Sequence, residues 1–125
     1  MSEFDNLSPD VKAILYDLNN QLYISSLVVI ELVQLYQLKK IQSKNFNTAQ
    51  TLVESIEKEY FIKIKPFAEE HTLMLCKLNR SSGHNDPFDH AIIAHAITEK
   101  LTLVSSDRKF QHYIIQGLDF VFNKR

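Results

Sequence analysis

Three acidic side chains stand at positions where chemistry would explain their presence. The first is Glu31, the single charged residue in the apolar segment 27–33. On a helix it shares one face with Leu27, Leu35 and Leu38. A carboxylate in such a stripe is unfavourable to bury unless it is paired, protonated or bound to a metal. The alternative is a glutamate at the helix edge that reaches water or caps a neighbouring backbone group.

Asp89 and Asp107 are the other two, and each comes at the expected start of a helix. Asp89 is the third residue of a helix that Asp86 and Pro87 open, and Asp107 follows an expected strand. Acidic residues at such positions commonly cap free backbone amides, which is the simpler interpretation of either residue alone. Asp89, however, also lies on the apolar stripe of its helix, and this stripe should face the sheet.

A shared cation would explain all three carboxylates together. Clustered like charges repel each other unless a cation neutralises them, and hard oxygen ligands suit Mg²⁺ or Mn²⁺. Such an ion lowers the pKa of a bound water and stabilises charge on a phosphate during in-line attack. Glu31, Asp89 and Asp107 are therefore the candidate metal ligands and catalytic residues.

Histidines offer a rival metal site. His84, Asp86 and His90 are close in sequence, so a zinc or manganese site of a small metallohydrolase is conceivable. The set matches no established ligand spacing, which favours the carboxylate interpretation. His95 and His112 are expected to be ordinary surface or boundary residues.

Charge and cysteine content narrow the function classes. The net charge is -1, so any nucleic-acid binding must rest on a local basic patch. Arg80, Arg108 and Lys109 are the candidates to hold an RNA backbone, with simple surface charge as the alternative for each. Cys76 is the one cysteine, which excludes an internal disulfide, and its apolar surroundings predict a buried side chain.

The apolar pattern alternates between short runs and helical periods, which predicts α and β elements in turn. Ser8 and Pro9 are expected to open the first helix. Further helices are expected from Ser25 or Ser26 to about 40, at 45–58, 67–78 and 86–100, and just after 107, with strands at 22–24, 61–64, 101–104 and 118–122. Such an order favours parallel strands with ligands at their carboxyl ends, where Glu31 and Asp107 would lie.

The length of 125 residues suits one domain. The start of the sequence has no signal-peptide pattern, and no apolar run is long enough to span a membrane. We therefore expect a cytoplasmic protein with no membrane partner.

Two later segments resemble a known family. Residues 84–96, HNDPFDHAIIAHA, are similar to the "H-x-D-P-F-D-R-x-L-I-A-Q-A" segment of PIN-domain toxins of the VapC-like type. Residues 101–110, LTLVSSDRKF, resemble their "L-x-L-V-T-x-D-x-x-F" segment. Residues 22–26 with Glu31 are similar to their "S-x-x-S-x-x-E" region, a weaker signal. The resemblance extends over about residues 8–122.

The resemblance implies a single PIN-like α/β domain over 1–125, a three-layer sandwich with a mostly parallel sheet of about four strands. It implies an Mg²⁺- or Mn²⁺-dependent ribonuclease that cuts single-stranded RNA, acting as the toxin of a toxin–antitoxin pair and often a homodimer. The matching acidic positions are Glu31, Asp89 and Asp107, with Asp86 as an accessory carboxylate.

One departure from the family pattern concerns the first strand. In the family a "Y-L-L-D-T-x" strand lies in the middle of the sheet and supplies the first metal aspartate. This sequence begins after that point, and Asp5 does not replace it because no strand precedes Asp5. The start could lie upstream, the chain could be a non-catalytic relative that binds protein or RNA, or another chain or a rearranged sheet could fill the gap. Exposed strand edges invite pairing, so we expect dimerisation or a changed strand order, and weakened metal binding.

Overall fold

The computed structural model describes residues 7–41 and 46–124. The chain divides into two compact units, which are described separately below. The small unit is Gln21–Phe67, and the large unit combines Met1–Asn20 with Ala68–Arg125.

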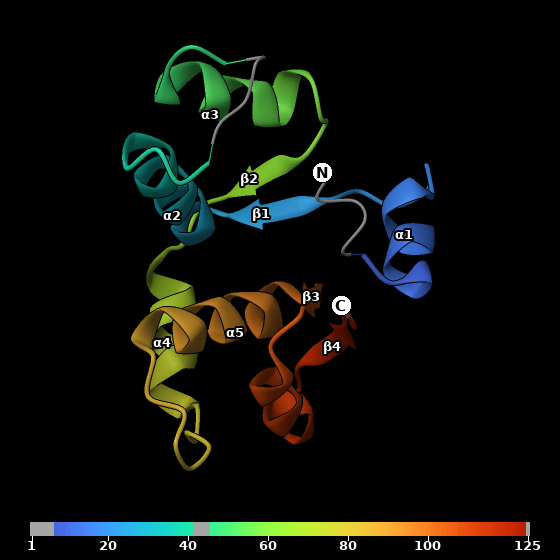
Figure 1. Ribbon diagram of the computed structural model, residues 1–125. Coiled ribbons are helices and arrows are strands. Elements are labelled where there is room, and N and C mark those ends of the chain that lie inside the picture. Colours follow the sequence, from blue (N-terminus) through green and yellow to red (C-terminus); the bar gives the residue numbers. More distant parts are fainter. Residues whose placement is uncertain (1–6, 42–45, 125) are drawn as a thin grey trace. The chain divides into compact units, whose positions relative to one another are not determined.

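The described elements alternate between helices and short strands (Figure 1). The helices are α1 (Pro9–Tyr16), α2 (Ser26–Gln37), α3 (Ala49–Lys58), α4 (Glu69–Lys77) and α5 (Pro87–Glu99), together with the 3-10 helix η2 (Arg108–Gln116). The strands are β1 (Tyr23–Ser25), β2 (Lys63–Lys65), β3 (Thr102–Ser105) and β4 (Asp119–Phe122).

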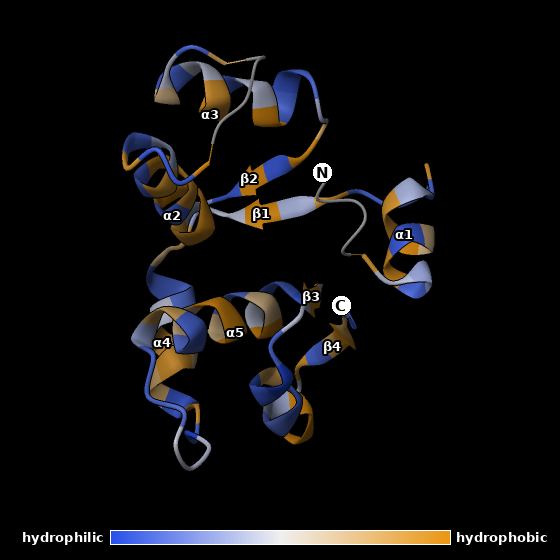
Figure 2. Cartoon of the chain, in the orientation of Figure 1, coloured by the Kyte–Doolittle hydropathy of each residue, from blue (hydrophilic) through white to orange (hydrophobic). Residues whose placement is uncertain are grey.

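The large unit is organised around α5 and η2. Its buried cluster consists of Ile93, Phe110, Tyr113 and Leu118, with partly buried residues from α5, β3 and β4 packed against it. Figure 2 shows apolar residues along much of α5, which fits a helix placed between α4 and this cluster. β3 and β4 pair in parallel, and Thr102 lies opposite Asp119. This pair is also joined by a 2.7 Å hydrogen bond from the threonine hydroxyl to the carboxylate.

The small unit pairs β1 with β2 in parallel, with Ile24 opposite Ile64. α2 and α3 pack on each other, and Ile56 of α3 is buried. The Tyr36 hydroxyl of α2 donates to the Phe46 carbonyl at 3.1 Å, which fixes the chain just before α3. No residue of α2 is fully buried.

Most predicted elements are confirmed, and local capping explains their bounds. The hydroxyl of Ser8 accepts from the Val11 amide at 3.3 Å and begins α1, with Pro9 at the first helical position. The helix expected at 45–58 begins instead at Ala49, because the Thr48 hydroxyl accepts from the Thr51 amide at 3.1 Å. Residue 45 itself lies outside the described part.

The strands confirm a parallel α/β arrangement, but they occur as two pairs. The structure has four strands in two two-stranded sheets, β1–β2 in the small unit and β3–β4 in the large unit. Across residues 7–41 and 46–124, no ladder joins one sheet to the other. Each sheet therefore presents strand edges that no other described strand covers.

Two burial predictions were wrong. Cys76 is exposed. The inward face of α4 carries the buried His71 and the partly buried Leu75, and Cys76 lies about a quarter-turn away from that face. His95 is buried, with 4% of its surface exposed, because α5 is covered along much of its length. His112 is exposed, as expected.

None of the helices in the described part of the chain has the length and apolar character needed to cross a membrane.

Candidate active site in the large unit

Asp89 lies in the first turn of α5. The Asp86 carboxylate accepts from the Phe88 amide at 2.9 Å and begins the helix, with Pro87 at its first position. Capping is thus the role of Asp86, which is exposed, and not of Asp89. The Asp89 side chain is 26% exposed, and its Oδ2 lies 3.2 Å from His84 Nε2. Its Oδ1 has no hydrogen-bond partner among the residues that the structure describes.

His84 connects Asp89 to the core. Its Nδ1 lies 2.8 Å from the Tyr113 hydroxyl, and both residues are buried, with 2% and 0% of their surfaces exposed. The Tyr113 oxygen accepts a hydrogen bond from the Ser81 amide at 3.0 Å. The tyrosine proton is therefore available to His84 Nδ1.

Asp107 follows the carboxyl end of β3 and begins η2. Its Oδ1 accepts from the Lys109 amide at 2.9 Å, and its own amide donates to the Ser105 hydroxyl at 3.1 Å. The capping interpretation is thus correct for this residue, but it occupies one carboxylate oxygen only. Asp107 Oδ2 has no hydrogen bond within the described ranges.

Asp89 and Asp107 belong to the same neighbourhood of the large unit. The ring of Phe110, three residues after Asp107, lies 6.0 Å from the ring of His84, which holds Asp89. Each carboxylate thus has one oxygen held by the protein and one left over. Carboxylate oxygens of this kind suit a hard divalent cation such as Mg²⁺ or Mn²⁺ by their chemistry. Among the described residues, neither Asp89 nor Asp107 belongs to a group of three ligand atoms within 4.8 Å of one another.

Asn123 holds the segment that carries Asp107, and Asn123 was not among the predicted site residues. The Asn123 side chain accepts from the Ser8 amide at 2.7 Å and donates to the Ser106 hydroxyl at 2.9 Å. The backbone amide of Asn123 donates to the Ser105 carbonyl at 2.8 Å. A buried asparagine directly after the last strand was the available signal, since buried amides need several partners.

Glu31 lies on α2 in the small unit and is exposed there. Two members of its expected stripe, Leu35 and Leu38, are 37% and 57% exposed. The predicted stripe is thus a surface feature of the small unit. The structure brings Asp89 and Asp107 into one unit and leaves Glu31 in the other.

In the described part of the large unit, His84, Asp86 and His90 do not form a group whose ligand atoms lie close together, so the rival metal site is not assembled. Both nitrogens of His84 are committed, to Tyr113 and to Asp89. Burial lowers the pKa of His90 below its ordinary value, and the nearby His84 and Arg80 lower it further. His90 Nε2 is buried without a hydrogen-bond partner among the described residues, and one such nitrogen does not make a metal site.

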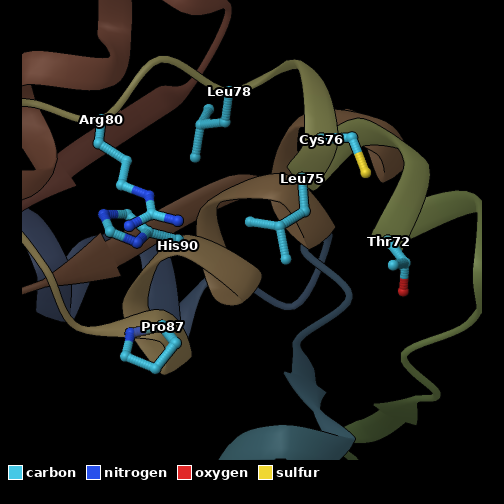
Figure 3. Close-up of a pocket in the computed structure, with 7 residues that line it drawn as sticks. All are labelled: Thr72, Leu75, Cys76, Leu78, Arg80, Pro87 and His90. Atoms are coloured by element: carbon cyan, nitrogen blue, oxygen red, sulfur yellow. The ribbon is translucent and has the colours of Figure 1, made fainter.

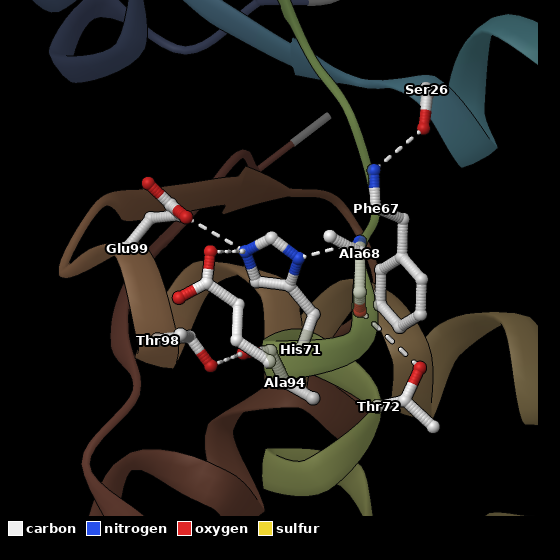
Figure 4. Close-up of polar contacts among 9 residues, drawn as sticks. Ser26, Phe67, Ala68, His71, Thr72, Ala94, Thr98 and Glu99 are labelled. Atoms are coloured by element: carbon white, nitrogen blue, oxygen red, sulfur yellow. Dashed lines mark hydrogen bonds and ion pairs between the residues drawn. The ribbon is translucent and has the colours of Figure 1, made fainter.

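One cluster with metal-ligand geometry does exist in the described residues, formed by His71, His95 and Glu99 (Figure 4). The ligand atoms lie within 4.8 Å of one another. His71 Nδ1, however, accepts from the Ala68 amide at 2.8 Å, so the imidazole proton is on Nε2, 2.7 Å from the Glu99 carboxylate. Coordination by Nε2 would remove that proton and disturb the cap of α4. The geometry favours a hydrogen-bonded connection between α4 and α5 over a metal site.

A pocket of the large unit lies between α4 and the start of α5 (Figure 3). Its volume is about 320 Å³. It is lined by Thr72, Leu75, Cys76, Leu78, Arg80, Pro87 and His90. The lining is apolar and cationic and contains no acidic residue, and the pocket borders α5, the helix that carries Asp89.

The predicted RNA-binding residues are all exposed. Arg80 lines the pocket just described. The Arg108 guanidinium lies 4.5 Å above the ring of Phe122, a cation–π arrangement that holds it beside Asp107. Lys109 is the next residue of η2.

Comparison with known proteins identifies the family. A model of the PIN domain matches residues 5–115, and the chain therefore belongs to the PIN-domain family. Comparison with curated proteins gives no match. Among solved structures, a chain of VapBC2 from Rickettsia felis, crystallised with a DNA fragment from their promoter, has a TM-score of 0.59 and 23% identity. The likeness covers 92% of this chain and 83% of that one, and it confirms the predicted PIN-like α/β fold.

Proposed function

We propose that this chain is a divalent-metal-dependent endoribonuclease, the toxin of a toxin–antitoxin pair, that hydrolyses phosphodiesters of single-stranded RNA. The observation that carries the proposal is that Asp89 and Asp107 both lie in the large unit, each with one carboxylate oxygen left over. Membership of the PIN-domain family supports the same conclusion.

The carboxylates have distinct tasks in this proposal. Asp89, held by His84, and Asp107, held by the first turn of η2, would hold Mg²⁺ or Mn²⁺ together with the sequence candidate Glu31, and Asp86 would assist. When bound, such an ion lowers the pKa of a water and stabilises negative charge on the phosphate. Glu31 enters the site on sequence grounds alone.

RNA would be held by charge beside the carboxylates. Arg108 and Lys109 follow Asp107 directly, and Arg80 precedes the loop that carries His84. Salt-sensitive phosphate contacts from these three residues would bind RNA without sequence preference. An antitoxin protein is the expected partner, since the similar Rickettsia felis chain was crystallised as VapBC2.

Cleavage of a labelled single-stranded RNA with Mn²⁺, with Mg²⁺ and with chelator tests the proposal. We expect metal-dependent cleavage that Asp89→Asn and Asp107→Asn reduce by at least about tenfold, while His112→Ala, on the exposed side of η2, retains it. Metal-independent cleavage, or none at all in a folded chain, would refute the nuclease. RNA binding without cleavage, unchanged in Asp89→Asn, would instead identify a non-catalytic PIN-like binding module.

A further inference from the structure

Resting on the proposed function, we propose that His84 is a positioning residue for the metal ligand Asp89, and that Tyr113 selects the histidine tautomer that does this. The chain of contacts is continuous. The Ser81 amide donates to the Tyr113 oxygen, Tyr113 donates to His84 Nδ1, and His84 Nε2 donates to Asp89 Oδ2.

The donor and acceptor in each of these hydrogen bonds follow from the first donor, the Ser81 amide. A backbone amide can only donate, so the Tyr113 oxygen accepts from Ser81 at 3.0 Å. If His84 carried its proton on Nδ1, two donors would face the tyrosine oxygen, and the tyrosine proton would be left in a buried site. The neutral Nε2–H tautomer avoids this and directs a donor toward the carboxylate.

The loop before α5 is folded to place His84 at this point. The His84 amide donates to the Ser81 carbonyl at 3.0 Å, which closes a tight turn. Gly83 within the turn has a φ of +80°, a conformation that favours glycine. The Tyr113 hydroxyl therefore contacts both ends of the turn, through the Ser81 amide and the His84 ring.

The consequence for Asp89 is a carboxylate with divided roles. Oδ2 is held by His84 Nε2 at 3.2 Å, and Oδ1 is left for the ion. Partners of metal ligands of this kind commonly change metal affinity by about 10- to 100-fold when removed. A histidine that serves only to fill the core would have no such effect.

Two substitutions at His84 separate these roles. Glutamine offers one donor and one acceptor, as the neutral histidine does, but fills the space less well, whereas leucine is apolar and suits a buried position. We expect His84→Leu to weaken Mn²⁺ binding by about 10- to 100-fold and His84→Gln by clearly less, measured by calorimetry on the 125-residue chain. Asp89→Asn gives the reference for a lost ligand, and His112→Leu is the exposed control.

The tautomer is measured directly and without metal. Long-range ¹H–¹⁵N spectra should show His84 with its proton on Nε2 in the wild type, and a changed tautomer balance in Tyr113→Phe, which removes only the hydroxyl. This spectrum decides the matter even if His84→Leu does not fold.

The possible results distinguish the positioning role of His84 from the proposed nuclease activity. Mn²⁺ binding that depends on His84 in a chain that cuts no RNA would support the positioning role and refute the nuclease. A proton on His84 Nδ1, or a folded His84→Leu chain with wild-type Mn²⁺ affinity, would overturn the positioning role alone. A wild-type chain that binds no Mn²⁺ would overturn both.

Discussion

Each candidate carboxylate has a structural contact as well as a proposed chemical role, and single substitutions separate the two. Asp107 is the clearest case, because one oxygen caps η2 and the other is left over. Asparagine is as good an N-cap as aspartate, so Asp107→Asn should keep the stability within about 0.5 kcal/mol, whereas Asp107→Ala should lose about 1 kcal/mol. Urea unfolding measures this difference.

The same two variants should behave alike toward metal. Both remove the anionic oxygen, so both should weaken Mn²⁺ binding by at least about tenfold. Wild-type affinity in a folded Asp107→Asn chain would leave the residue with its capping role alone.

His90 should make the stability of the large unit depend on pH. Burial lowers its pKa in the folded state below the ordinary value of 6.5, so the unfolded chain takes up the proton first as the solution is acidified. Its contribution therefore destabilises the fold as pH falls from about 6.5 toward the lowered folded pKa. Melting temperatures of the chelated protein across this range should fall less steeply for His90→Leu than for the wild type, and equal slopes would count against the assignment.

The sequence supports a prediction of the site residues but not of their surroundings. Asp86, Asp89 and Asp107 are predicted because spacing, capping positions and family pattern coincide there. The hydrogen bonds of His84 to Tyr113 were not predictable, since the two residues are separated by 29 positions. A pattern along the chain reports which face a residue occupies, and it gives no information on such distant partners.

The two helices that frame the large unit are joined by a histidine that serves as a cap. α4 begins after Ala68, which has no side-chain acceptor, and His71 Nδ1 satisfies the Ala68 amide instead. Nε2 of the same ring donates to Glu99 near the end of α5 (Figure 4). One ring thus completes the start of one helix and contacts the end of the next.

Removing this ring should be costly. His71→Ala is expected to lower the free energy of unfolding by about 2 kcal/mol, as the sum of a lost cap and a lost hydrogen bond to a charged group. Thr72→Ala, at the exposed neighbouring position with a long 3.4 Å contact to the Ala68 carbonyl, is the matched control and should change it little. Equal effects of the two variants in urea unfolding would show that the His71 cap contributes nothing specific to stability.

Element positions were largely predictable, and their pairing was less so. Ser8, Asp86 and Asp107 begin helices as their side chains suggested, because capping is a local interaction. The expected single sheet is present as two parallel pairs, and strand pairing depends on distant segments that no local pattern describes.

For the molecule as a whole, the family pattern adds Glu31 to the proposed ligands Asp89 and Asp107. If these residues share an ion, Mn²⁺ should stabilise the chain, by about 2.7 kcal/mol at a concentration one hundred times the dissociation constant. Glu31→Gln should reduce this stabilisation in thermal melts, with Glu54→Gln, on the exposed surface of α3, as control. An unchanged Mn²⁺ effect in Glu31→Gln would exclude Glu31 from the site.

Self-association is the second expectation at this scale. Ile30 of α2 and Leu38 at the C-cap of that helix are each 57% exposed, and apolar residues exposed along one helix favour a protein contact. We expect sedimentation to give twice the monomer mass, and Ile30→Lys to shift the chain toward monomer. A monomer at all concentrations would contradict the predicted homodimer.

The Tyr113 hydroxyl has a consequence for motion in the large unit. The Ser81 amide belongs to a polar surface loop, yet its hydrogen bond ends on a side chain whose ring lies in the buried cluster. Its hydrogen–deuterium exchange should therefore be slow, at a rate set by opening of that cluster and not by fluctuation of the loop. This one amide would report, from the rim of the proposed catalytic centre, how often the interior opens.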